Sequence, residues 1–369
     1  MEKYKRIYKD LYYKIKTGEI PSGTKLPTEE QLAAQYGVSK ITAKAALNLL
    51  QKDGLVIRKK RLGTLVLNDV VNALGEKLIA IVFSGFDHLD TRFINGLKQL
   101  AAPMGVKLAF FDSKISPEKE REILLFLLSE NIAGLILMPT SQDHNLDVIS
   151  AFEVQKIPVV YMDFPLLGSI APTVTSDNFG ASYDLVKYLL EMGHREIGFF
   201  PYSDSFIPTE RDRFRGYCRA LIENGIPINA DYLFPISARC MYTMISSVSA
   251  MDMTGAEEFF ARYESLDRKP TAIVCINDLS AYAVITVARK RGLSVPEDLS
   301  VTGFDNLTVA TKWDITTVAQ NFTEIAKNAL QVLIRRMEGS TVELPTVKIK
   351  TVLIRRESVS RISSPDDSE

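Results

Sequence analysis

The chain has 369 residues, 46% of them hydrophobic, and a formal net charge of −1 at pH 7. This length predicts two or three domains, each large enough to bury a core of its own. Three scattered cysteines exclude a disulfide framework and a cysteine metal site, no apolar run is long enough to cross a membrane, and the N-terminus lacks the apolar region of a signal peptide. We therefore expect a cytoplasmic protein that uses no cofactor and no metal.

Charge is distributed unevenly along the chain. Residues 1–70 contain 14 Lys and Arg against 7 Asp and Glu, whereas the remainder contains 30 against 38, so formal charges of +7 and −8 make up the total of −1. A basic head on an acidic body favours contact between the head and a polyanion, and repulsion of that polyanion by the body.

The head contains two predicted short helices joined by a tight turn. Thr28 can cap the first helix and Gly37 can end it in a left-handed conformation, and Ser39 can cap the second. Two helices joined in this way form a helix-turn-helix. From their helical spacing, we expect burial of Leu32, Ala33 and Tyr36 in the first helix and of Ile41, Ala45, Leu49 and Leu50 in the second.

A basic hairpin follows the second helix. Residues 55–57 and 64–67 read as strands, and the turn at 58–63 carries four cations. Each feature alone is also compatible with ordinary helix punctuation or a solvated hairpin, but their order favours a winged helix-turn-helix that reads double-stranded DNA from the major groove. The predicted DNA contacts are Thr28, Ser39, Lys40, Thr42, Lys44, Arg58, Lys59, Lys60, Arg61, Gly63 and Thr64.

Residues 3–67 resemble the gluconate-repressor (GntR) family of bacterial transcription factors. The resemblance is carried by Ile7, Leu11 and Ile15 of a first helix and by the segments GEIPSGTKLPTEEQLA, YGVSKITAKAAL, LQKDGLV and GTLV. The chain departs from the family at Lys40 and Lys44, where the family usually has Arg, at Arg61 for Gly and at Leu65 for Phe. The resemblance implies the fold of a head at 1–67, whereas the base contacts are not transferable.

After a predicted linker at 68–76, apolar runs alternate with helical stretches, which is the pattern of parallel sheets in an α/β fold. The first set has runs at 78–83, 106–111, 133–138 and 157–162 with helices around 92–102, 118–130 and 144–154. The second has runs at 197–200, 271–276 and 299–304 with helices near 210–224 and 278–291. We expect two doubly wound lobes, one at 77–175 with 307–337 and one at 176–306 with 338–358, and a polar tail at 359–369.

Ligands of such sheets bind outside the carboxyl ends of the strands. Asp163, the pair of Asn277 and Asp278, and Asp305 follow three of the apolar runs, and Arg213 lies in a helix that follows a fourth. We expect four or five of these side chains to converge on one cleft. Some polar residues of this region are expected to be structural: Asp278, Asp177 and Asn178 as helix caps, and His194 in a helix-ending motif.

Residues 77–358 resemble the effector domains of lactose-repressor-type regulators and the related periplasmic sugar-binding proteins. The matching segments are DNFGASYDLVKYLLEMGHREIGFF, RFRGYCRAL, CINDLSAYAVITVARKRGLSVPEDLSVTGFDN and ITTVAQNFTEIAKNAL. The resemblance implies that Asp163, Arg213, Asn277, Asp305 and Gln320 bind the effector, and such groups suit the hydroxyls of a sugar. We add Asp90, Arg92 and Phe93 as contacts from the first lobe, and Phe86, Phe164 and Trp313 as rings that can cover a sugar, although such rings more often belong to cores.

The two resemblances together imply a bacterial transcriptional regulator. We expect a repressor of a carbohydrate-utilisation operon that binds a pseudo-palindromic operator as a homodimer, without membrane contact, and is released by a monosaccharide or a derivative. Two alternatives stay open. One is a sugar-modifying enzyme with a DNA-binding head, although the chain has no phosphate loop, nucleophile elbow or metal-ligand spacing. The other is a regulator whose ligand acts as corepressor or activating signal.

Overall fold

The computed structural model describes residues 3–16, 19–20, 24–53, 55–59, 63–66, 77–84, 91–101, 106–130, 132–201, 207–235, 253–338 and 346–362. The chain forms two compact units, the first made mainly of residues 1–78 and the second of nearly all the rest. The predicted linker at 68–76 lies outside the described residues. None of the described helices is long and apolar enough to span a membrane.

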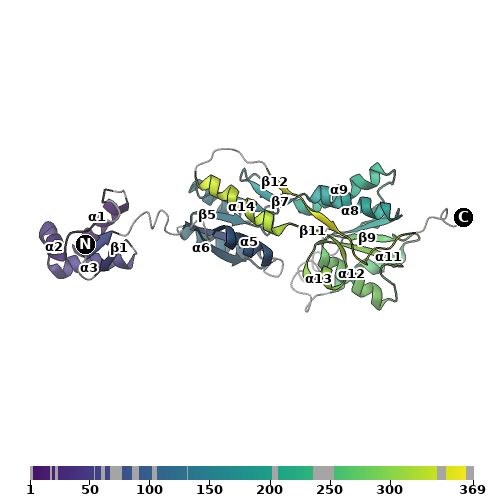
Figure 1. Cartoon of the computed structure of the whole chain (residues 1–369), viewed down its shortest axis with the longest axis horizontal. Helices are drawn as coiled ribbons and strands as arrows, with labels where there is room; N and C mark the ends of the chain where they lie inside the picture. The colour runs from purple at the N-terminus through teal and green to yellow at the C-terminus, as the bar shows by residue number, and fades with distance from the viewer. Residues whose placement is uncertain are drawn as a thin grey trace. The chain divides into compact units, whose positions relative to one another are not determined.

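The N-terminal unit contains the predicted winged helix-turn-helix (Figure 1). Its elements are the helices α1 (Lys3–Lys16), α2 (Glu29–Tyr36) and α3 (Lys40–Lys52) and the antiparallel hairpin of β1 (Val56–Lys59) and β2 (Gly63–Val66). Thr28 caps α2 in a capping box with Gln31, Gly37 ends α2 with a φ of 63°, and Ser39 caps α3. The three expected helix signals are therefore confirmed.

The buried face of α3 differs from the predicted one. Of the four residues expected to be buried, Leu50 is buried, Ala45 and Leu49 are half-buried, and Ile41 is 80% exposed. The side chains of α3 that are buried are Ala43, Ala46, Leu47 and Leu50. Helical spacing gives the period of the apolar residues but not the direction of the buried face. That direction is set by packing, because Ile7, Leu11 and Ile15 of α1 share one core with these four residues and with Leu32 of α2.

The first lobe of the second unit is a six-stranded sheet in the order β4–β3–β5–β6–β7–β12. Its strands are β3 (Lys77–Phe83), β4 (Val106–Asp112), β5 (Gly134–Leu137), β6 (Val159–Met162), β7 (Thr173–Ser176) and β12 (Val347–Ile349). Its helices are α5 (Thr91–Ala101), α6 (Pro117–Ser129), α7 (Leu146–Val154) and α14 (Phe322–Met337), the last of which packs on β5, β6, β7 and β12.

The second lobe is a five-stranded sheet in the order β13–β11–β10–β9–β8. Its strands are β8 (Ile197–Phe200), β9 (Ala272–Cys275), β10 (Ser300–Asp305), β11 (Thr316–Ala319) and β13 (Val352–Ile354), which runs antiparallel to β11. Its α-helices are α8 (Asn178–Glu191), α9 (Pro208–Glu223), α11 (Thr254–Ser265), α12 (Asp278–Lys290) and α13 (Thr308–Lys312). In Figure 1, α8 and α9 lie on one side of this sheet and α11, α12 and α13 on the other.

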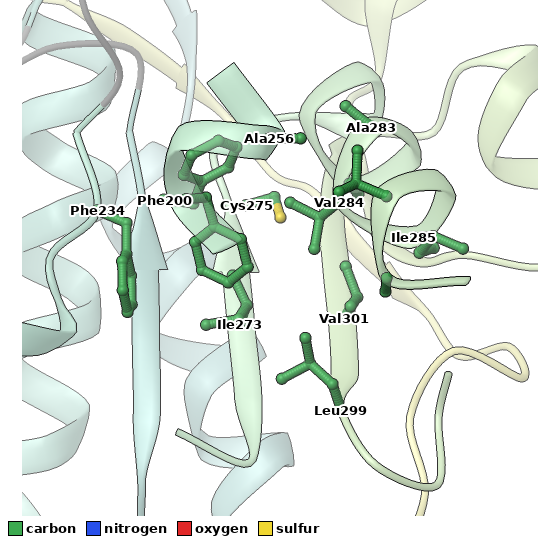
Figure 2. Packing of buried hydrophobic residues seen from close by; sticks show 14 of the residues in the cluster. Phe200, Phe234, Ala256, Ile273, Cys275, Ala283, Val284, Ile285, Leu299 and Val301 are labelled. Atoms are coloured by element: carbon green, nitrogen blue, oxygen red, sulfur yellow. The ribbon is translucent and has the colours of Figure 1, made fainter. Parts of the chain in front are cut away.

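Helices on both faces explain the apolar runs of this lobe. Figure 2 shows Ile273 and Cys275 of β9 and Val301 of β10 pointing into a buried cluster with Val284 of α12. Strands that are covered on both faces lose the alternation of polar and apolar residues. The runs predicted as strands therefore coincide with β8, β9 and β10, as they do with β3 to β6 in the first lobe.

Three segments cross between the lobes, and their positions correct the expected lobe boundaries. The chain crosses between β7 and α8, between β11 and α14, and between β12 and β13. Residues 316–319, expected in the first lobe, pair with β10 in the second, whereas residues 347–349, expected in the second lobe, pair with β7 in the first. The expected polar tail also begins later, because Val359 is buried and the Ile362 amide donates to the Met192 carbonyl.

The corrected face of α3 can be tested by two matched truncations. Leu47→Ala removes a fully buried side chain and should destabilise the N-terminal unit by about 2 to 5 kcal/mol, whereas Ile41→Ala should change its stability by less than about 0.5 kcal/mol. Hydrogen exchange of peptides from residues 3–53 in the full-length chain measures both. Equal acceleration of exchange in the two variants would contradict the assignment.

Candidate functional site

The N-terminal end of α3 forms the exposed part of the predicted DNA surface. Lys40 and Lys44 are exposed, and Lys40 forms an ion pair with Glu30 of α2. The Ser39 hydroxyl accepts a hydrogen bond from the Thr42 amide and lies 2.8 Å from the Thr42 hydroxyl. Both hydroxyls are thus oriented by the helix cap at the helix end that is predicted to approach DNA.

The hairpin residues have more varied positions than the sequence indicated. Arg58 is half-buried, forms an ion pair with Glu29 and donates to the Asn48 side chain at 2.8 Å, so it braces the hairpin against α2 and α3. Thr64 is buried, which corrects its assignment as a DNA contact. Gly63 is exposed with a φ of 91°, and exposed Thr28 belongs to the capping box. Lys60 and Arg61 lie outside the described residues, as does the side chain of Lys59.

The second candidate site lies at the carboxyl ends of the strands of the second unit. Asp163 follows β6, Asp305 ends β10, Gln320 follows β11, and Asn277 separates β9 from α12. The Gln320 amide donates to the Asp305 carboxylate at 2.6 Å, and the Arg213 guanidinium of α9 lies 3.8 Å from the same carboxylate oxygen. Arg213, Asp305 and Gln320, from three different elements, are thus brought together.

Arg213 is the most completely anchored residue of this site. Only 8% of its surface is exposed. Its Nε donates to the Asn178 side chain at 2.9 Å, its Nη1 donates to the Ile276 carbonyl at 2.6 Å, and its guanidinium lies 3.6 Å from the centre of the Phe304 ring. A buried guanidinium is tolerated only when its donors are satisfied, so these contacts fix its position before a ligand arrives.

Burial also shifts the pKa values of two carboxylates of this site, Asp163 and Asp305. It raises the pKa of Asp163 to about 6; the Arg213 charge opposes this shift and the Asp305 charge adds to it. Burial likewise raises the pKa of Asp305, whereas Arg213 and the hydrogen bond from Gln320 lower it. Both residues have left-handed backbones, with φ values of 71° for Asp163 and 104° for Asp305. Perturbed carboxylates on constrained turns are typical of functional sites.

Hydrogen bonds connect this site to the crossover segments. The Ser176 hydroxyl at the first crossover lies 2.6 Å from Oε1 of Gln320 at the second and can donate to it. The Asp177 amide donates to the Ile349 carbonyl of the third crossover at 2.9 Å. Asn178, which receives the Nε bond of Arg213, donates to the Ser176 carbonyl at 3.1 Å. Two candidate ligand residues, Gln320 and Arg213, are therefore bonded to the crossover segments, which form the hinge between the lobes.

The polar residues expected to be structural have mixed roles. Asp177 caps α8 as expected, but α12 is capped by Asn277, whose side chain accepts from the Ser280 amide at 2.9 Å, rather than by Asp278. Sequence reasoning missed Asn178 as the partner of Arg213, because an Asn beside a helix start reads as a cap. The feature of the sequence that could have identified Asn178 is its position as the first residue of α8, directly after the first crossover.

The described aromatic candidates differ in their burial. Phe93 and Phe164 are buried, and Phe86 and Asp90 lie outside the described residues, as does the side chain of Arg92. Trp313 is half-buried and packs edge-on against Tyr282, with ring centres 4.7 Å apart. It lines a separate pocket of about 600 Å³ whose lining contains none of the five polar candidates of the cleft.

The described residues contain no group of three or more His, Cys, Asp or Glu side chains that could hold a metal ion. His194 is buried and its two ring nitrogens lie 2.9 Å from the Thr271 hydroxyl and 3.1 Å from the Ser360 carbonyl. These contacts confirm the expected structural role of His194, which ties the last described segment of the chain to the second lobe.

Comparison with known proteins assigns both units. Residues 3–66 match the gntR family of bacterial regulatory proteins, and residues 186–359 match the periplasmic binding protein-like domain. The arabinose metabolism transcriptional repressor of Geobacillus stearothermophilus is 29% identical over 99% of this chain and 98% of its own length. The transcriptional repressor CytR of Escherichia coli (strain K12) is 29% identical over 72% of this chain and 74% of its own length.

Solved structures agree on the fold. The complex of the transcriptional regulator CelR with cellobiose has a TM-score of 0.64 at 22% identity and covers 90% of this chain and all of its own. A LacI family transcriptional regulator from Enterococcus faecium with bound ribose has a TM-score of 0.64 at 20% identity and covers 78% of this chain and all of its own. Residues 3–66 are therefore a gntR-family DNA-binding domain and residues 186–359 belong to a periplasmic binding protein-like domain, and the similar chains from Geobacillus stearothermophilus and Escherichia coli are transcriptional repressors.

Proposed function

We propose that this protein is a homodimeric repressor of a carbohydrate-utilisation operon and that a monosaccharide or sugar derivative releases it from its operator. The observation that carries the proposal is the cluster of Asp163, Arg213, Asp305 and Gln320 at the crossovers between two lobes, in a chain that begins with a DNA-binding domain. The alternative of a sugar-modifying enzyme receives no support from the similar proteins named above, which are transcriptional regulators.

The chemistry of the cluster favours a sugar. Carboxylates accept hydrogen bonds from neighbouring hydroxyls, a guanidinium donates to ring or hydroxyl oxygens, and an amide does both. One cation beside two carboxylates leaves little net charge for the ligand to neutralise, which suits an uncharged molecule. The relatives supply the probes, since one is a repressor of arabinose metabolism and two solved neighbours hold cellobiose and ribose.

The crossovers provide the link to DNA binding in this proposal. A sugar held by Asp163 of the first lobe and Arg213 of the second would bridge the lobes and so favour one angle between them. The crossovers would respond to the sugar because Gln320 and Asn178 bond to them. In a dimer, that angle would change the spacing of the two heads on a pseudo-palindromic operator. A coupling free energy of about 1 to 3 kcal/mol is sufficient, since it changes operator affinity about 5- to 150-fold.

The sugar response is tested by fluorescence anisotropy of operator DNA at fixed salt concentration, with arabinose, ribose, cellobiose and related sugars. At least one sugar should weaken operator binding by about fivefold or more. Arg213→Ala should abolish this response and keep operator affinity in the absence of sugar. Arg215→Ala, a control at an exposed position of the same helix, should keep both. An operator affinity unchanged by every sugar would refute the proposal.

The raised pKa of Asp163 predicts a pH-dependent affinity for the sugar. The ionised carboxylate is the better acceptor of hydroxyl hydrogen bonds, and at pH 5 only about one tenth of a group with a pKa of about 6 is ionised. Sugar affinity measured by calorimetry should therefore fall by up to about tenfold from pH 7.5 to pH 5. Asp163→Asn should bind more weakly and with a flatter pH profile, whereas Asp212→Asn should match the wild type.

The exposed position of Lys44 on α3 predicts how operator binding depends on salt concentration. Lys44→Ala should weaken binding and reduce the slope of log affinity against log salt concentration by about 1, because one phosphate contact is lost. Lys52→Ala, at an exposed position in the last turn of the same helix, serves as control and should leave the slope unchanged. Equal slopes for the wild type and Lys44→Ala would remove Lys44 from the DNA surface.

A further inference from the structure

Asp278 is a fully buried carboxylate that is neither a helix cap nor one of the candidate ligand residues. One of its oxygens accepts a hydrogen bond from the Leu307 amide at 2.6 Å, and the other accepts one from the Thr317 hydroxyl at 2.5 Å. Leu307 and Thr317 both belong to residues 305–320, which leave the candidate site at Asp305 and return to it at Gln320. We call residues 305–320 the site segment.

The two partners lie on opposite legs of the site segment. Leu307 is two residues beyond Asp305 on the outgoing leg, and Thr317 is three residues before Gln320 on the returning leg. The two legs start and end as neighbouring strands, since Asp305 of β10 pairs with Ala319 of β11. A single side chain bonded to both legs therefore restricts the distance between Asp305 and Gln320.

The outgoing leg needs such restraint because its backbone is strained. Asp305 and the next residue, Asn306, both have left-handed backbones, with φ values of 104° and 55°. A non-glycine residue in this region is unfavourable and persists only where surrounding contacts hold it. The bond from the Leu307 amide to Asp278 comes directly after the two strained residues, so it holds the turn where the strain ends.

Two further features are built around this arrangement. A Cβ atom at Gly303 would lie 2.3 Å from Oδ1 of Asp278, so the glycine makes room for the carboxylate beneath β10. Arg356 also donates to the Asn306 side chain and to the Ile315 carbonyl, both at 2.7 Å. Arg356 thus bonds to the same two legs as Asp278.

We propose that Asp278 is a positioning residue that holds Asp305 and Gln320 at the spacing required for effector binding. Asp278 acts through the site segment and does not touch the effector. This inference rests on the proposed function in so far as it predicts effector affinity, whereas the restraint on the site segment is independent of it.

Burial raises the pKa of Asp278 well above its usual value, and the charge of Asp305 adds to the shift, while the bonds from Thr317 and Leu307 oppose it. The restraint does not require a negative charge. A protonated oxygen can donate to the Thr317 hydroxyl while the other oxygen still accepts from the Leu307 amide. Asparagine offers the same combination of one donor and one acceptor in the same shape.

Two threonine variants test the restraint with little risk to folding. Thr317→Val removes one bond to Asp278, whereas the control Thr302→Val removes a buried hydroxyl in neighbouring β10 that bonds to the Ile273 carbonyl instead. Without any sugar, Thr317→Val should speed hydrogen exchange at the Leu307 amide and Thr302→Val should not. With arabinose or ribose, whichever the wild type binds, Thr317→Val should weaken binding by about three- to tenfold and Thr302→Val by less than about twofold.

Variants at position 278 separate positioning from a merely structural contribution. Asp278→Asn should retain the Leu307 protection and the sugar affinity, and Asp278→Ala should lose both, with operator affinity in the absence of sugar retained throughout. Thermal unfolding of each variant measures its overall stability. If Asp278 acts by positioning, the differences in melting temperature among the variants should not parallel the differences in their sugar affinity.

If hydrogen exchange at the Leu307 amide is unchanged in Thr317→Val, Asp278 does not restrain the site segment. If exchange is faster but sugar affinity is unchanged, the restraint exists but does not contribute to sugar binding. Equal loss of sugar affinity in Thr317→Val and Thr302→Val would also contradict the inference, because it would reflect general loosening of the lobe. A wild type that binds none of the sugars would refute the proposed function and the affinity arm, while the exchange arm would still decide whether Asp278 holds the site segment.

Discussion

The candidate effector site depends on the burial of one guanidinium at the junction of the two lobes. A buried cation is costly unless its donors are bonded and its charge is balanced, so Arg213 dictates what surrounds it. Asn178, the Ile276 carbonyl and Asp305 together meet its three nitrogens. Because these partners come from the first crossover, the end of β9 and the end of β10, one side chain ties the hinge to the ligand-facing edge of the second lobe.

The same residue accounts for the unequal behaviour of the two carboxylates. Asp305 is close to Arg213 and also accepts from Gln320, so two favourable contacts oppose the effect of burial on its pKa. Asp163 reaches the site from the first lobe, where burial raises its pKa to about 6 against the Arg213 charge. A ligand that donates hydroxyls to Asp163 would replace the water it lacks, which favours contact between the lobes in the ligand-bound state.

Much of the fold and part of the site follow from local sequence patterns, and the remainder depends on contacts between distant segments. The apolar runs identify β3 to β6 and β8 to β10 because parallel strands are buried on both faces, and Asp163, Asn277 and Asp305 are recognisable because they follow such runs. The threonine-rich strand β11 and the three-residue strand β12 lack that signal, which is why the lobe boundaries were wrong. Ile41 was assigned to the core because a helical period does not reveal which side α1 covers.

The head shows how similar basic residues divide between folding and recognition. Glu29 and Glu30 occupy the first turn of α2, where acidic groups favour the helix dipole, and they pair with Arg58 and Lys40. Both side chains of the Lys40–Glu30 ion pair are exposed, so water and salt screen the interaction. A DNA phosphate can therefore compete with Glu30 for the lysine at little cost in free energy. Arg58 is less exposed and also donates to Asn48, so its release would leave polar groups of α2 and α3 without their partner. The number of cationic side chains in the head is therefore an upper limit on the number that can contact DNA. Which of them are available depends on which are paired with acidic side chains.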